Sequence, residues 1–96
     1  MYALHFASTF PSTYKSIIKG NKEFEKRTKK VLRLIKNDPF YPSLKSHKVN
    51  TRNFGKKWSS WITGDLRIIW DFDESKKQII ILFALSKHSG SSREYK

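Results

Sequence analysis

Two histidines, one carboxylate and one arginine are the side chains of this sequence best suited to chemistry. His47 lies in a lysine-rich segment, and His88 follows an apolar run. Asp65 stands two residues before Arg67. Cleavage of an RNA backbone without a metal needs a base for the 2′-hydroxyl proton, an acid for the departing 5′-oxygen and a cation for the phosphorane oxygens. Imidazole can act as acid or base near neutral pH, so these residue types predict RNA cleavage.

Each of these residues also has a structural explanation. A histidine between lysines in a loop is commonly solvated, which would make His47 a surface residue. His88 directly follows a strand and could simply cap it. Asp65 comes after Thr63 and Gly64, where aspartate is a common turn residue. The sequence leaves both explanations open for all three residues.

Arg67 interrupts a strand that is otherwise mostly apolar. Residues 58–73 predict two strands joined by a two-residue turn at Thr63 and Gly64. A period of two places the apolar side chains of the second strand on one face: Leu66, Ile68, Trp70 and Phe72. A cation in the middle of a strand is costly unless it meets water, a carboxylate or an anionic ligand. A buried pair with Asp71 or Glu74 is the alternative to a phosphate site.

Basic and aromatic residues near these positions are candidates for RNA contact. Lysines flank both histidines, and Trp58 and Trp61 are three residues apart in one predicted strand, so they point to opposite faces. We expect one tryptophan to pack in the core and the other to be available for stacking on a base. The predicted RNA-binding residues are Lys45, Lys48, Lys56, Lys57, Trp61, Lys87 and Arg93.

The charge of the chain predicts a polyanionic partner. The 96 residues include 20 Lys and Arg but only 8 Asp and Glu, for a net charge of +12. Such an excess favours nucleic acid first, then an acidic protein, then a membrane surface. A lysine-rich surface that reflects genome composition is the alternative.

Composition also limits the other classes of function. Cysteine is absent, and the three histidines lack metal-ligand spacing, so we expect no metal and no small-molecule cofactor. No apolar run approaches 18 residues and no signal sequence is recognised, so we expect a cytoplasmic protein without membrane contact.

Hydrophobic periodicity predicts one α+β domain over residues 1–96. An alternating segment at 2–7 predicts a strand, and two apolar stripes at helical spacing predict helices over residues 10–18 and, for about 15 residues, before Asn37-Asp38-Pro39. Residues 39–57 are expected to form a basic loop, and residues 78–85 a central strand. The predicted order is β-α-α-β-β-β, with an antiparallel-rich sheet and a helical hairpin on one face.

Two segments carry a resemblance to a known family. Residues 38–48 (DPFYPSLKSHK) and 58–70 (WSSWITGDLRIIW) resemble the RelE/ParE toxin superfamily, and within it the YafQ-like messenger RNA interferases of type II toxin–antitoxin modules. The resemblance implies a RelE-like fold, ribosome-dependent endoribonuclease activity on mRNA and neutralisation by an acidic antitoxin.

The resemblance also implies roles for individual residues. By position, His47 is similar to the first catalytic histidine of the YafQ-like group, and His88 is similar to its C-terminal histidine. Asp65 resembles the acidic residue two places before the arginine of the strand, here Arg67. The sequence departs from the family pattern at Trp61, where relatives commonly have Arg or His, and at Ala84, where YafQ-like enzymes can have Arg. Tyr95 also lies farther from the last histidine than the usual aromatic residue.

Two other functions are compatible with the same residues. A ParE-like toxin would inhibit DNA gyrase without any histidine chemistry. A basic RNA-binding protein without turnover would show affinity that falls steeply with salt, but no cleavage products.

Overall fold

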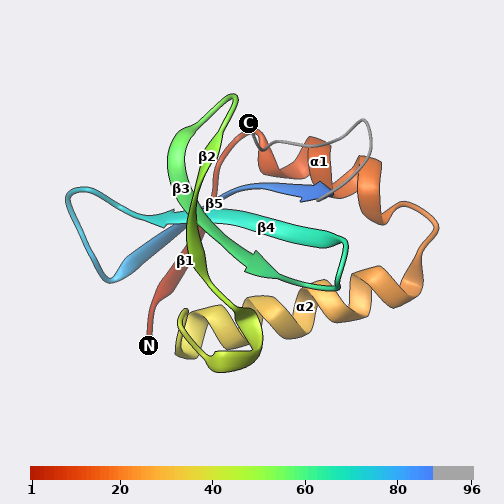
Figure 1. Ribbon diagram of the computed structural model, residues 1–96, viewed down its shortest axis with the longest axis horizontal. Helices are drawn as coiled ribbons and strands as arrows, with labels where there is room; N and C mark the ends of the chain where they lie inside the picture. Colours follow the sequence, from red (N-terminus) through yellow and green to blue (C-terminus); the bar gives the residue numbers. More distant parts are fainter. Residues whose placement is uncertain (88–96) are drawn as a thin grey trace.

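The computed structural model describes residues 1–87 of the chain as two helices and a five-stranded sheet (Figure 1). The elements in chain order are β1 (Ala3–Phe6), α1 (Phe10–Ile18), α2 (Lys22–Asn37), the 3₁₀ turn η1 (Pro42–Leu44), β2 (His47–Thr51), β3 (Gly55–Trp61), β4 (Leu66–Phe72) and β5 (Ile79–Lys87). The strand order in the sheet is β1-β5-β4-β3-β2. β1 runs parallel to β5, and the other neighbours are antiparallel. The predicted α+β class is confirmed.

Local signals define the two helices. Pro11 occupies the first turn of α1, where its missing N–H is not needed. Asn21 caps α2, because its side-chain oxygen accepts a hydrogen bond from the Phe24 N–H at 3.0 Å. The chain runs out along α1 and back along α2 (Figure 1), as predicted for a helical hairpin.

The core lies between this hairpin and one face of the sheet. Leu66, Ile68 and Trp70 of β4 are buried in one cluster, as the alternation of that strand predicted. The cluster also includes residues of both helices and of β5: Phe10, Ile18, Val31, Ile35, Ile80, Leu82 and Leu85. A register shift between Ile69 and Trp70 marks an irregularity in the β4–β5 pairing. The residues that alternate with these core positions, among them Arg67 of β4, lie on the opposite sheet face.

The structure corrects two expectations about the middle of the chain. Residues 39–57 are not all loop, because they contain η1, β2 and the start of β3, so the sheet has one strand more than predicted. β2 is an edge strand with Val49 as its one apolar side chain, and such a strand shows no apolar alternation. The β3–β4 turn spans residues 62–65 rather than two residues. Thr63 Oγ1 accepts hydrogen bonds from the N–H groups of Asp65 and Leu66 there, which stabilises a longer turn.

None of the helices in the described part of the chain is long and apolar enough to cross a membrane.

Candidate functional site

Strand register brings His47, Trp61 and Arg67 to the sheet face that points away from the helices. Ser59 pairs with His47 across β2 and β3, and Trp61, two residues further along β3, pairs with Arg67 of β4. Residues directly opposite each other, and residues two apart on one strand, share a face. We call this face the open face.

Arg67 is nearly buried and contacts the β3–β4 turn. Its side chain is 4% exposed, and its Nη1 donates to the carbonyl oxygens of Thr63 at 2.7 Å and Gly64 at 2.8 Å. Its guanidinium carbon also lies 4.3 Å from the centroid of the Trp61 ring. These contacts compensate for part of the cost of burying the charge. Arg67 therefore stabilises the β3–β4 turn and contacts the Trp61 ring from a buried position.

Replacing Arg67 with methionine should destabilise the fold. The change removes charge-assisted hydrogen bonds to Thr63 and Gly64, so we expect the free energy of unfolding to fall by about 1.5–3 kcal/mol in urea denaturation. Lys57→Met is the matched control, because Lys57 lies on the same face and pairs with Asp71 at 3.6 Å near the surface. Lys57→Met should lower the free energy of unfolding by at most about 1 kcal/mol. Equal effects of the two changes would contradict the anchoring role.

Trp61 holds a second cation beside Arg67. The Lys45 Nζ lies 4.4 Å from the centroid of the Trp61 ring, within cation–π range. Lys45 is exposed, whereas Arg67 is not. Lys45 is therefore the cation of this pair that can contact a ligand directly. The sequence predicted Trp61 as a base-stacking residue, and the structure shows that its ring also positions two positive charges.

The backbone of Lys45 orients the imidazole of His47. Lys45 adopts a left-handed conformation with φ 49° at the end of η1, and its carbonyl oxygen lies 2.9 Å from His47 Nδ1. A carbonyl oxygen can only accept, so Nδ1 carries the proton in this contact. In the neutral ring Nε2 is then the nitrogen that can take a proton. This tautomer leaves Nε2 as the nitrogen that could act as a general base.

A chain of hydrogen bonds connects the core to the segment before His47. Trp70 Nε1 donates to Ser60 Oγ at 2.7 Å, the hydroxyls of Ser60 and Ser46 are 2.6 Å apart, and Ser46 Oγ donates to the Pro39 carbonyl oxygen at 2.6 Å. Because the Ser46 proton is directed at a carbonyl, Ser60 must donate to Ser46. Each donor thus has an acceptor, and such chains are mutually strengthening. The serines were not identified from the sequence, where serine in a strand carries no distinctive signal.

The other predicted residues do not all gather on the open face. Asp65 is exposed in the β3–β4 turn. Lys57 lies on the open face, paired with Asp71. Register places Lys48 on the helical side, where its Nζ is 5.0 Å from the Trp58 ring, and Lys56 and Lys87 alternate to the same side. These three lysines are therefore not brought together with His47. His88 and Arg93 lie outside the described residues.

The two tryptophans of β3 point to opposite faces, as predicted. Trp58 stacks on Trp70 with ring centroids 5.8 Å apart and an interplanar angle of 16°. Phe40 adds an edge contact to Trp58 at 4.9 Å. Trp58 is therefore part of an aromatic cluster on the core side, and Trp61 is the tryptophan of the open face.

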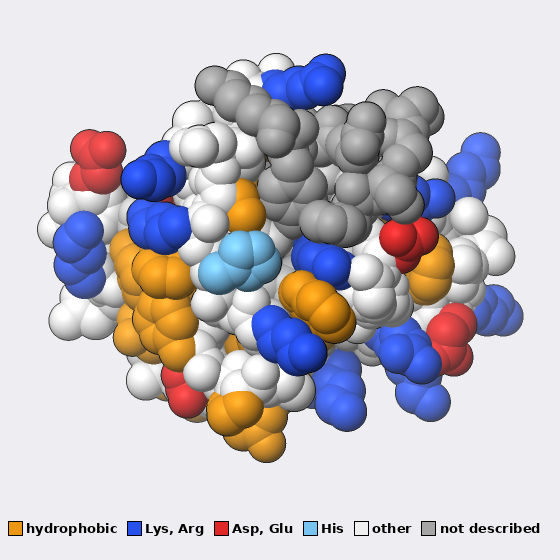
Figure 2. All heavy atoms as spheres, viewed as in Figure 1, with side chains coloured by type: hydrophobic (Ala, Val, Ile, Leu, Met, Phe, Trp, Pro, Cys, Tyr) orange, Lys and Arg blue, Asp and Glu red, His pale blue; other side chains and the backbone are white. Residues whose placement is uncertain are grey.

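Positive charge extends well beyond the site. Figure 2 shows Lys and Arg side chains spread over one side of the molecule, with few carboxylates among them. Among residues 1–87, no group of three His, Asp or Glu side chains is placed to hold a metal ion. The candidate site consists of the cations Lys45 and Arg67, the imidazole of His47 and the indole ring of Trp61.

Several solved structures with this fold are toxins. The chain is similar to a metal-bound toxin from Helicobacter pylori, with 18% identity, a TM-score of 0.70, and coverage of 92% of this chain and 96% of that one. It is similar to the DinJ–YafQ complex of E. coli, with 14% identity, a TM-score of 0.69, and coverage of 92% and 94%. It is also similar to the archaeal RelE–RelB complex from Pyrococcus horikoshii OT3, with 14% identity, a TM-score of 0.68, and coverage of 94% and 98%.

These similarities confirm the RelE/YafQ-type fold that the sequence predicted. No protein-family model and no curated protein sequence matches the chain. At such low identity the likeness establishes the architecture only, so the function must be argued from the site.

Proposed function

We propose that this protein is the toxin of a type II toxin–antitoxin module and cleaves mRNA on the ribosome. The observation that carries the proposal is the hydrogen bond from His47 Nδ1 to the Lys45 carbonyl, beside the Trp61 ring that holds Lys45 and Arg67. The His47 imidazole, Lys45 and Arg67 are grouped around one sheet face, which supports a role for His47 as base and for the two cations as phosphate-stabilising groups. The net charge of +12 supports a nucleic-acid substrate.

The proposed reaction is metal-independent attack of the 2′-hydroxyl on the adjacent phosphorus. Nε2 of His47 takes the hydroxyl proton, the 2′-oxygen bonds to phosphorus, and the bond to the 5′-oxygen breaks. The products are a 2′,3′-cyclic phosphate and a 5′-hydroxyl. The exposed ammonium of Lys45 stabilises charge on the phosphorane oxygens. The buried guanidinium of Arg67 adds to the positive electrostatic potential there.

Two roles in this proposal rest on the sequence alone. His88 is assigned as the acid that protonates the 5′-oxygen, by its resemblance to the C-terminal histidine of YafQ-like enzymes. Asp65 is assigned to the site by the same resemblance, although its backbone N–H hydrogen bond to Thr63 also serves the turn. Base contacts are assigned to Trp61, which is half-buried.

The proposed partner that silences the toxin is an acidic antitoxin. Two similar structures are complexes of this kind, RelE–RelB and DinJ–YafQ. A disordered acidic segment that folds on binding would suit a chain of this charge. The module would act in the cytoplasm, where translating ribosomes are found.

The test uses purified protein, translating ribosomes and a defined mRNA. We expect cuts at codon-phased positions on ribosomes, with cyclic phosphate ends, and little cutting of the same RNA alone. A parallel assay measures supercoiling by DNA gyrase. Gyrase inhibition without mRNA cleavage would favour the ParE-like alternative. RNA binding without cleavage, both on ribosomes and with the RNA alone, would favour a basic RNA-binding protein without nuclease activity.

A further inference from the structure

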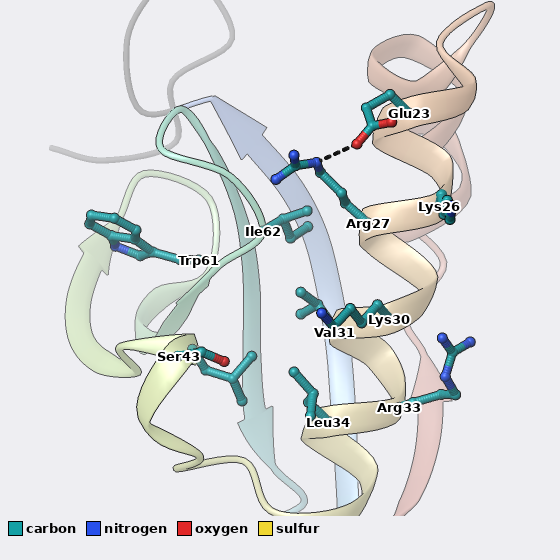
Figure 3. Close-up of a pocket in the computed structure, with 11 residues that line it drawn as sticks. Glu23, Lys26, Arg27, Lys30, Val31, Arg33, Leu34, Ser43, Trp61 and Ile62 are labelled. Carbon is teal, nitrogen blue, oxygen red and sulfur yellow. Dashed lines mark hydrogen bonds and ion pairs between the residues drawn. The ribbon is translucent and has the colours of Figure 1, made fainter.

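A groove between α2 and the β3–β4 turn adjoins the candidate site. It has a volume of about 450 Å³, within the range of sites that hold a small-molecule-sized group. Val31 and Leu34 of α2 point toward Ile62 of the turn across its floor, and the Trp61 ring is turned away from the helix (Figure 3). Leu44 of η1 completes the apolar floor.

The rim of this groove is positively charged. Lys26, Arg27 and Lys30 line it from α2. Arg27 donates from Nε to Glu23 at 2.7 Å, and this hydrogen bond lowers the pKa of the Glu23 carboxyl. The charge of Arg27 is thereby offset. Lys26 and Lys30 form no ion pair within residues 1–87, so they give the groove a net positive charge.

An apolar floor with a basic rim suits a nucleotide better than a free inorganic anion. A base can cover the apolar floor while its phosphates meet the lysines. Lys26 and Lys30 are one helical turn apart, with about 5–6 Å expected between their Cβ atoms, so both can contact the backbone of one strand. Arg33, at the next turn of α2, also lines the groove.

Trp61 connects the groove to the candidate site. The same residue lines the groove and contacts both Lys45 and Arg67 on the open face. A single strand bound beside His47 would therefore reach the groove by passing Trp61.

We propose that the groove holds nucleotides of the substrate RNA next to those at His47, with a base on its apolar floor and phosphates on Lys26 and Lys30. The proposal rests on the proposed function, because it takes the strand at His47 to be RNA. The second segment of the RNA-binding surface would then lie on α2.

The experiment measures binding of fluorescent 2′-O-methyl oligouridylates, which lack the nucleophilic hydroxyl. Lengths of about 4 and about 12 nucleotides bracket the common range of single-strand sites. In the double variant Lys26→Gln/Lys30→Gln, the slope of log affinity against log salt for the longer strand should decrease in magnitude by about 1.4, since each lost phosphate contact contributes about 0.7. The short strand fits the His47 site alone. Its affinity for the double variant should therefore equal its affinity for the unchanged protein.

Lys22→Gln/Lys36→Gln is the matched control, because it removes the same charge from the two ends of α2 outside the groove. It should leave the slope nearly unchanged. Equal slopes in both double variants, an unchanged slope in the groove variant, or failure of the longer strand to bind the intact protein would each overturn the proposal. So would loss of polyglutamate binding in the groove variant with RNA binding intact, which would assign the groove to an acidic protein segment.

Failure of this proposal and failure of the proposed function remain distinguishable. A groove-dependent salt slope without cleavage on ribosomes would retain the groove and refute the nuclease. Codon-phased cleavage with no groove-dependent slope would retain the nuclease and refute the groove.

Discussion

Replacing His47 with glutamine is expected to slow mRNA cleavage on ribosomes by about 10²–10⁴-fold, the range in which general acid–base catalysis contributes. Glutamine can still occupy this exposed position, but it cannot take a proton from the 2′-hydroxyl. The comparison is made by single-turnover cleavage of a ribosome-bound message, with circular dichroism to show that the fold is kept.

His5→Gln is the matched control for His47→Gln. His5 is also an exposed histidine of a strand, but β1 lies at the edge of the sheet opposite to β2. The control should cleave at the rate of the unchanged protein. The pH dependence adds a second readout, because the limb of the profile that reports the base should disappear in the His47 variant alone. Full activity of His47→Gln would remove His47 from the reaction.

Replacing Trp70 with alanine is expected to have the largest effect on stability. Trp70 is fully buried at the centre of the core cluster, and its ring packs against Trp58 and Phe72. Truncation leaves a large cavity and removes the donor to Ser60, so we expect a loss of about 3–5 kcal/mol in the free energy of unfolding. A loss of that size is a large fraction of the stability of a small domain, and urea denaturation can measure it.

Two smaller changes separate the ring of Trp70 from its hydrogen bond. Trp70→Phe keeps an aromatic ring but leaves Ser60 without its donor, and Ser60→Ala leaves the indole N–H without its acceptor. Each should be clearly less destabilising than Trp70→Ala, and the N–H orphaned by Ser60→Ala should cost about 1–3 kcal/mol. If Trp70→Ala costs no more than Ser60→Ala, packing of the ring is not the dominant contribution.

The elements that were predicted correctly are determined by residues that lie close together in the sequence. The stripes of α1 and α2 and the alternation of β4 are local patterns, and each appears in the structure. The opposite directions of Trp58 and Trp61 follow from the same period of two. Local geometry sufficed because one amphipathic face must be buried against the rest of the chain.

The candidate site was only partly predictable. Residue type and family resemblance singled out His47, Asp65, Arg67 and His88, and their catalytic roles stay predictions. Nothing in the sequence indicated that Arg67 would contact turn carbonyls or that Trp61 would hold two cations. Those contacts arise from pairing across β3 and β4 and from the position of η1, which brings Lys45 over the ring.

The amino-acid sequence was thus sufficient for the helices, the buried face of β4, the charge and the fold family, because these follow from periodicity and composition. Tertiary structure alone decided that His47 begins an edge strand, that the Lys45 carbonyl selects its tautomer, and that Lys26 and Lys30 border a groove next to Trp61. The physical reason is that a strand with one neighbour needs no apolar alternation, and that contacts between distant segments depend on register and packing, which no local pattern encodes.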